Sequence, residues 1–306
     1  MRNYLNAEFI LVKFPLIFPL IYFIILSTKP ELETLLIFFT IIILAETHFG
    51  ATWPFFLNKT NFSYIKSNRT SLIIIPITIA LLSLISFIFF KSIFLLIFFA
   101  CNVYHVTRQS YGVCKLYTSK TSEINFSETF IYVYNFIFFV IGFFRFYLPL
   151  ISQDQLIALN LIVLSSIFII LLIYFIKFKF SNGFFTFTTG LIIFYPICFV
   201  NNPVHAIIMG VTMHYTQYLF LTFKVYQGRI IDRIIQIPMS KYLGIIIVYS
   251  LLMSFLSLAG KSTNDVLNFL IIIPIIGQML HFYLDSQLWK FSEPHNRENI
   301  LKYIKI

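Results

Sequence analysis

Long runs of apolar residues dominate this chain and limit what it can fold into. A helix that crosses a membrane needs about 20 mostly apolar residues, and the sequence offers ten such stretches in succession. They lie at residues 8–27, 34–58, 72–90, 92–113, 128–151, 155–176, 183–200, 203–224, 242–259 and 265–289. A mean hydropathy of 0.87, with only 11% charged residues in 306, excludes an ordinary water-soluble protein. The sequence therefore predicts an all-α fold, a polytopic integral membrane helical bundle of about ten transmembrane helices.

The division into stretches predicts one transmembrane domain, residues 1–291, and a short tail, residues 292–306. Only Lys91 separates the third stretch from the fourth, and the seventh is short. The first stretch has no small-residue cleavage site after it, so it is expected to be a retained membrane helix. In the tail, Ser292 is expected to cap a helix with Pro294 in its first turn. An apolar stripe including Ile300 and Ile304 then predicts a helix at the membrane interface.

Basic residues give the direction of the predicted spans. With ten spans, both termini and every second loop share one side of the membrane. That side holds 16 of the 22 Lys and Arg residues, namely Arg2, Lys59, Lys66, Arg69, Lys115, Lys120, Lys177, Lys179, Lys224, Arg229, Arg233, Lys241, Lys290, Arg297, Lys302 and Lys305. Membrane proteins retain basic residues on the cytoplasmic side, so both termini are expected to be cytoplasmic. This topology, together with anionic lipid, explains the net charge of +10 without a nucleic-acid partner.

Four histidines lie at matching positions in spans that run from the outside to the cytoplasm. They are His48, His105, His214 and His281, in the second, fourth, eighth and tenth stretches. Each precedes by 9 to 11 residues a lysine expected at the inner interface, namely Lys59, Lys115, Lys224 and Lys290. A rise of about 1.5 Å per residue puts every imidazole roughly 14–16 Å above its lysine, close to one plane. Because ionisable groups inside a membrane are costly, this shared depth predicts one metal site formed by the four histidines.

Each of these histidines is followed four residues later, on the same helix face, by a polar residue. The pairs are His48 with Thr52, His105 with Gln109, His214 with Tyr218 and His281 with Asp285. A metal-bound imidazole normally donates its other N–H to such a neighbour, and Asp285 is also a candidate fifth ligand. Glu46 lies on another face from His48 and is expected either in an ion pair with Arg108 or Arg145 or in catalysis. The candidate catalytic residues are therefore Asp285, Glu46, Gln109 and Tyr218, whereas His205 and His295 lie outside the common plane.

Neutral imidazoles without thiolates indicate the metal. Cys101, Cys114 and Cys198 form no CxxC pair, and structural zinc favours cysteine ligands. Four histidines suit Fe²⁺, with copper or zinc as alternatives. Iron with open positions would bind O2 and a substrate. A site in the inner half of the membrane is reached most easily by a lipophilic small molecule from the lipid bilayer. Gly50, Gly112, Gly210 and Gly277 beside the histidines are expected to permit close helix packing or to leave room for a long chain.

Three short motifs carry a resemblance to a known family. "THFG" at 47–50, "VHAIIMGVTMH" at 204–214 and "LHFYLD" at 280–285 are similar to motifs of the Brp/Blh family of bacterial membrane β-carotene dioxygenases. The resemblance implies a polytopic protein of the bacterial inner membrane, with histidine-bound non-haem iron and a lipid, isoprenoid or carotenoid substrate. That family's first-helix histidine motif is absent, because residues 1–30 contain no histidine. The stretch "HFYLDSQLWK" at 281–290 also resembles the last helix of uncharacterised bacterial membrane proteins.

Two other classes of protein remain open at this point. In a b-type haem electron carrier, pairs of histidines clamp haems, although two stacked haems would need histidines at two depths. In a transporter or another non-catalytic membrane protein, the histidines would relay protons, and such proteins commonly show inverted repeats. The sequence shows no internal repeat, but Pro54, Pro149, Pro196 and Pro274 lie near the ends of predicted spans. A desaturase is not expected, because the chain has no HxxxH or HxxHH box.

Overall fold

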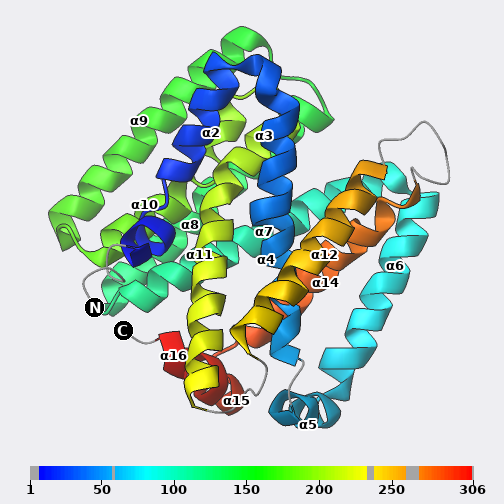
Figure 1. The fold of residues 1–306 in the computed structure, drawn as a ribbon. Coiled ribbons are helices and arrows are strands. Elements are labelled where there is room, and N and C mark those ends of the chain that lie inside the picture. The colour runs from blue at the N-terminus through cyan, green and yellow to red at the C-terminus, as the bar shows by residue number, and fades with distance from the viewer. Residues whose placement is uncertain (1–6, 57–58, 233–237, 260–268, 305–306) are drawn as a thin grey trace. The chain divides into compact units, whose positions relative to one another are not determined.

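The computed structural model describes residues 7–56, 59–232, 238–259 and 269–304, and every regular element within them is helical (Figure 1). The predicted all-α fold is therefore confirmed. The chain forms two compact units. The first contains Met1–Phe38 and Val103–Gln217, and the second contains Phe39–Asn102 and Tyr218–Ile306. The units are interleaved in sequence, since α3 (Glu33–Thr40), α7 (Lys91–Tyr117) and α11 (Pro203–Ile231) each contribute residues to both.

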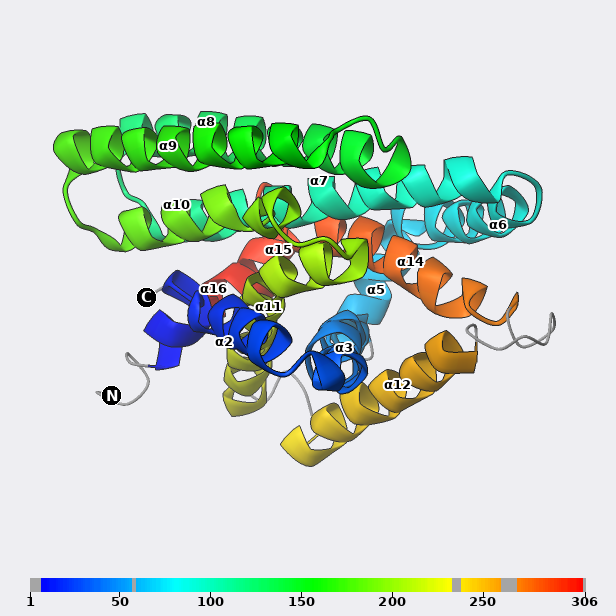
Figure 2. The same cartoon turned by 90° about the horizontal axis from the view of Figure 1, so that it is seen from above.

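The first unit is built around three neighbouring helices. Its elements, besides its shares of α3, α7 and α11, are η1 (Phe9–Lys13), α2 (Ile17–Thr28), η2 (Pro30–Leu32), α8 (Thr121–Gly142), η6 (Phe143–Tyr147), α9 (Gln153–Phe178), α10 (Asn182–Ile192) and η7 (Tyr195–Cys198). α10 packs against both α8 and α9, and η1 packs against α10 (Figure 2). A capping box formed by Ser152 and Gln155 begins α9. Buried aromatic rings fill the space between these helices, as where Tyr174 stacks on Phe187.

The second unit is centred on α12 and α14. Its further elements are η3 (Ile41–Ala45), α4 (Glu46–Gly50), η4 (Trp53–Phe56), α5 (Lys59–Ser67), η5 (Thr70–Ile74), α6 (Ile75–Phe89), α12 (Met239–Ala259), α14 (Ile272–Leu288), α15 (Pro294–Asn296), η8 (Arg297–Leu301) and α16 (Lys302–Ile304). α12 packs against α4, and α14 packs against both α4 and α6. One buried cluster joins Ala51, Tyr218, Tyr226, Tyr242 and Ile246. These contacts hold α4, α11, α12 and α14 in the arrangement on which the candidate site depends.

Among the described residues, five helices are long and apolar enough to cross a membrane, which supports a membrane protein. They are Pro30–Phe56, Thr70–Phe89, Thr121–Tyr147, Gln153–Phe178 and Met239–Ala259, and the helices Ile17–Thr28 and Asn182–Cys198 are apolar but shorter. α7 and α11, with 27 and 29 residues, have the length but carry more polar residues. Most of α11 is buried within protein, so its composition is set by packing and not by lipid. The count of ten spans and the cytoplasmic termini remain predictions.

Two of the predicted stretches are interrupted where a proline lies. The first, expected to be continuous over 8–27, breaks between η1 and α2 at Phe14, whose φ and ψ are −143° and 66°. Phe14 precedes Pro15, and a residue before proline is pushed out of the helical region. The seventh ends as an α-helix at Ile192 and continues as the 3-10 turn around Pro196. The boundary predicted at Lys91 is confirmed, because α6 ends at Phe89 and α7 begins at Lys91.

The C-terminal tail is helical, as predicted, over α15, η8 and α16. Its N-cap is Glu293, and Pro294 occupies the first turn, so the predicted cap at Ser292 is wrong. Ser292 lies one residue too early, because proline is preferred at the first helical position. Ile300 and Ile304 are buried, and their side of the tail packs on the second unit. The tail is therefore an integral part of that unit's core.

Candidate metal centre

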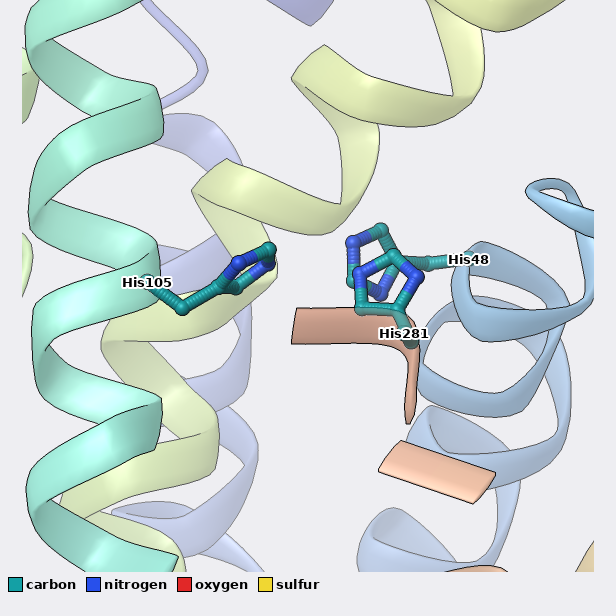
Figure 3. Close-up of side chains that lie close together, drawn as sticks. All are labelled: His48, His105 and His281. Atoms are coloured by element: carbon teal, nitrogen blue, oxygen red, sulfur yellow. The ribbon is translucent and has the colours of Figure 1, made fainter. Parts of the chain in front are cut away.

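The second unit brings His48 and His281 together. His48 lies on α4 and His281 on α14, and both side chains are fully buried. Their ring centroids are 4.5 Å apart at an interplanar angle of 70°, and one ring nitrogen of each lies within 4.8 Å of the other (Figure 3). Phe49 and Tyr218 flank the pair, with ring centroids 5.0 Å from His281 and 4.6 Å from His48, respectively. The packing of α14 on α4 thus buries a pair of imidazoles beside the aromatic rings of Phe49 and Tyr218.

A chain of hydrogen bonds runs from His281 to a buried carboxylate. Nδ1 of His281 lies 2.7 Å from Oγ1 of Thr52, which lies 2.8 Å from the hydroxyl of Tyr218. Tyr218 in turn is hydrogen-bonded to Asp285. The indole N–H of Trp289 donates to Oδ1 of Asp285 at 2.6 Å. Two helices of the second unit, α11 and α14, and the turn after α4 therefore meet in one polar network beside the histidine pair.

The direction of this chain fixes the tautomer of His281. With Asp285 ionised, its carboxylate only accepts hydrogen bonds, so the Tyr218 hydroxyl donates to it. Tyr218 then has only its oxygen lone pairs for Thr52, and Thr52 donates to it. The oxygen of Thr52 accordingly accepts from Nδ1–H of His281. The lone pair of His281 therefore resides on Nε2, the nitrogen available to a metal.

Removal of the Thr52 hydroxyl tests this chain of hydrogen bonds. Thr52→Val keeps the shape of the side chain but deletes the acceptor for His281, whose tautomer and ring orientation are then no longer fixed. We expect metal affinity to fall by about 10–100-fold, measured by competition with a chelating indicator dye. Thr52→Ser retains the hydroxyl and is expected to bind metal nearly as the parent does. Equal affinities of the valine and serine variants would show that Thr52 does not orient His281.

The first unit holds the other two histidines as a second pair. His105 lies on α7 (Figure 3) and His214 on α11, and both are buried. Their ring centroids are 5.4 Å apart and their planes are nearly perpendicular, at 89°. Gln109 follows His105 by one turn, and its amide nitrogen is buried without a hydrogen-bond acceptor among the described residues. Each unit thus buries two of the four histidines predicted as ligands.

Glu46 lies in the second unit beside α12 and α14. Its carboxylate is buried and accepts a hydrogen bond from Nε2 of Gln278 at 3.3 Å. Arg145, one of its two predicted ion-pair partners, donates instead to the carbonyl of Ile197 and to Asn201 within the first unit. The other, Arg108, is exposed. The described contacts of Glu46 therefore give no support to the predicted ion pair and leave the carboxylate as a candidate proton acceptor.

Two of the four glycines beside the histidines permit close packing of Tyr249. A Cβ atom on Gly50 would lie 2.9 Å from the Tyr249 ring, and one on Gly277 would lie 3.0 Å from its hydroxyl. Gly210 in the first unit approaches the backbone of Ile193 even more closely. A Cβ on Gly112 would meet no atom within 4 Å, so close packing explains three of the four glycines and not Gly112.

The structure brings the polar neighbours to other histidines than those expected. Thr52, expected beside His48, bonds to His281, because α4 ends at Gly50 and the turn that follows carries Thr52 across to α14. Tyr218, expected beside His214, contacts the pair formed by His48 and His281. Asp285 acts on its histidine through two hydroxyl groups. A spacing of four residues shows which side chains share one face of a helix, but it does not show which side chains of a neighbouring helix they contact.

His205 and His295 have structural partners of their own. In the first unit, Nδ1 of His205 is hydrogen-bonded to the hydroxyl of Tyr22 at 2.7 Å, and Nε2 of His205 is hydrogen-bonded to Oε1 of Glu33 at 2.7 Å. In the second unit, His295 bonds to Asn61. Sequence reasoning missed Trp289, which holds Asp285, although its position four residues after Asp285 on α14 is a usable signal.

The donor set in each unit suits a metal that prefers imidazole, such as Fe²⁺, Cu²⁺ or Zn²⁺, because the imidazoles are buried in pairs and the tautomer of His281 exposes Nε2. No family model matches this chain, and no curated protein or solved structure shows significant similarity to it.

Proposed function

We propose that the chain is a metal-dependent oxygenase of a membrane, with iron held by His48, His105, His214 and His281. The observation that carries this proposal is the burial of two histidine pairs, one of which is oriented by a hydrogen-bond chain ending on Asp285. Buried imidazoles oriented through a second partner are a common property of metal ligands.

Two further features favour one shared metal over two unrelated pairs. The first is the common depth of the four histidines in the sequence, which comes from their distances to the following lysines. The second is the continuity of α11, on which His214 lies one turn before Tyr218. Tyr218 in turn contacts the imidazoles of His48 and His281.

The side chains around the histidines have separate tasks under this proposal. His281 is held in one tautomer by Thr52, Tyr218 and Asp285. Glu46 accepts a proton from the substrate or from a water molecule, and Gln109 offers an amide donor beside His105. Iron would supply the activation of O2, and copper or zinc are the alternatives for this ligand set. The aromatic rings of Phe49 and Tyr218 beside the histidines exclude water from the site.

The substrate class follows from the surroundings. Both units contain long apolar helices, so we propose that a lipophilic molecule, such as an isoprenoid, a carotenoid or another lipid, reaches the site from the bilayer. The proposed location is a multi-pass arrangement in the inner membrane of a bacterium, with ten spans and both termini in the cytoplasm. This location agrees with the resemblance to the Brp/Blh motifs and with the distribution of basic residues.

Oxygen uptake tests the proposed activity. Protein reconstituted in vesicles with β-carotene and other isoprenoids is expected to consume O2 when loaded with Fe²⁺. Treatment with a chelator should abolish the uptake, and Fe²⁺ should restore it whereas Zn²⁺ should not, because zinc has no redox chemistry. Uptake that persists after the metal has been removed, or no uptake with any lipophilic substrate class, would contradict an iron oxygenase.

A further inference from the structure

Arg229 of the second unit is a buried charge that the proposed metal centre does not use. It lies in the last turn of α11, and its side chain has 0% exposure. Tyr218 and Arg229 are 11 residues apart on this helix, which corresponds to about 16 Å along the axis. Arginine stays protonated in proteins, and burial lowers the pKa of Arg229 only to about 10. A full positive charge therefore lies inside the second unit at neutral pH.

The nitrogens of Arg229 make no hydrogen bond to any of the residues that the structure describes. Nε and both terminal nitrogens are buried without an acceptor there. The guanidinium carbon lies 5.8 Å from the ring centre of Phe55, so the described contact is a cation–π contact. The C-terminus of α11 adds a partial negative charge, but no carbonyl oxygen there accepts from the guanidinium. Buried charges are normally paired and hydrogen-bonded, so this environment lacks an anion.

The carboxylates that follow Arg229 at the end of α11 and in residues 293–304 bind other groups or are exposed. Asp232 accepts from the ammonium of Lys302 at 2.5 Å and from the hydroxyl of Tyr303 at 2.8 Å. Glu293 pairs with Lys290, and Glu298 is exposed. His295 lies close enough to Arg229 for the positive charge, together with burial, to lower its pKa. The described carboxylates therefore do not neutralise the charge of Arg229 by direct pairing.

The C-terminal segment, Pro294–Ile304, covers this part of α11. Tyr303 packs so closely on Gly228 that a Cβ atom there would lie 2.3 Å from its ring. A small cavity of about 10 Å³ lies under the first part of the same segment, and Asn61, His295 and Asn299, but not Arg229, are among its lining residues. This volume holds about one water molecule, so a larger guest requires the segment to shift outward.

We propose that Arg229 anchors a binding site for a phosphate oxyanion, admitted beneath the C-terminal segment and supplied either by an anionic lipid headgroup or by free phosphate. The guanidinium offers paired N–H donors that match phosphate oxygens. Arg229 lies at the end of α11, beyond the apolar residues of that helix, where we expect the lipid headgroups of the bilayer. The site is independent of the proposed metal centre.

The test uses the full-length, delipidated protein in a non-ionic detergent. Its melting temperature is measured with inorganic phosphate against chloride at equal ionic strength, and with phosphatidic acid against phosphatidylcholine. A rise with phosphate alone identifies a site for free oxyanions, and a rise only with phosphatidic acid identifies a headgroup site. Arg229→Gln is expected to lose the rise, whereas Arg297→Gln, which removes an exposed cation from the same segment, is expected to keep it.

Several results would overturn the proposal. They are the absence of a rise with either probe, an equal rise in Arg229→Gln and the parent, and a loss in Arg297→Gln as large as that in Arg229→Gln. Should Arg229→Gln not fold, Arg229→Lys decides the question, because lysine keeps the charge but not the paired donors. A smaller rise than in the parent supports the site, and an equal rise overturns it.

Discussion

His281→Ala is expected to lose most of the bound metal together with the activity. His281 is fully buried, its Nδ1 is engaged by Thr52, and its Nε2 is the nitrogen available to a ligand. Under the proposed function, alanine at this position removes a metal ligand and not merely a contact. We expect the same result for His48, His105 and His214. Metal per mole of purified protein, measured by plasma mass spectrometry, gives the answer directly.

Two histidines outside the proposed site provide the controls. His205→Gln and His295→Gln remove imidazoles that bond to Tyr22 and Glu33 and to Asn61, and both variants are expected to keep their metal. Retention of full metal by all four alanine variants would make the histidines packing or proton-relay residues. A loss confined to one of the two histidine pairs would separate the pairs and contradict a shared metal.

Gly210→Ala is expected to destabilise the protein strongly. Gly210 lies on α11 in the first unit, and a Cβ atom there would lie 1.7 Å from the carbonyl oxygen of Ile193 and 3.4 Å from Pro196. Because the obstacle is backbone and not the end of a flexible side chain, α11 must move away. We expect a loss of about 3 kcal/mol, or a fall of roughly 6–12 °C in the melting temperature.

Gly112→Ala is the matched control for that substitution. Gly112 also lies in a helix of the first unit, but a Cβ atom there would meet nothing within 4 Å. Alanine is favoured over glycine in a helix by about 1 kcal/mol, so this variant is expected to be as stable as the parent or slightly more stable. Equal melting temperatures of the two alanine variants would show that α11 does not pack as closely as the structure indicates.

Periodicity and composition predict the helices because each apolar stretch can satisfy its backbone only internally in a lipid environment. The exceptions are local. Phe14 and Pro15 break a stretch whose hydropathy is continuous. The stretch 203–224 was predicted as a span from its composition, but most of α11 is buried within protein, and that burial depends on neighbours distant in the chain.

A fixed rise per residue converts spacing into height, and on that basis the four histidines were predicted to share one depth; the structure buries them as two pairs, one in each unit. Their partners were not predictable, because a contact such as that between Thr52 and His281 joins residues 229 positions apart. Arg229 was recognised only as one of many cytoplasmic cations. Its burial depends on Phe55 and on the C-terminal segment, which no local pattern connects to α11.

The metal content of the unmodified protein tests the central claim most directly. Protein purified in detergent without oxygen or chelators, and dialysed against metal-free buffer, is expected to retain close to one iron per chain. Incubation of a chelated sample with equal Fe²⁺, Cu²⁺ and Zn²⁺ then identifies which metal the histidines hold. Protein that contains no metal under any condition of purification and takes up none on incubation would contradict the proposed metal centre.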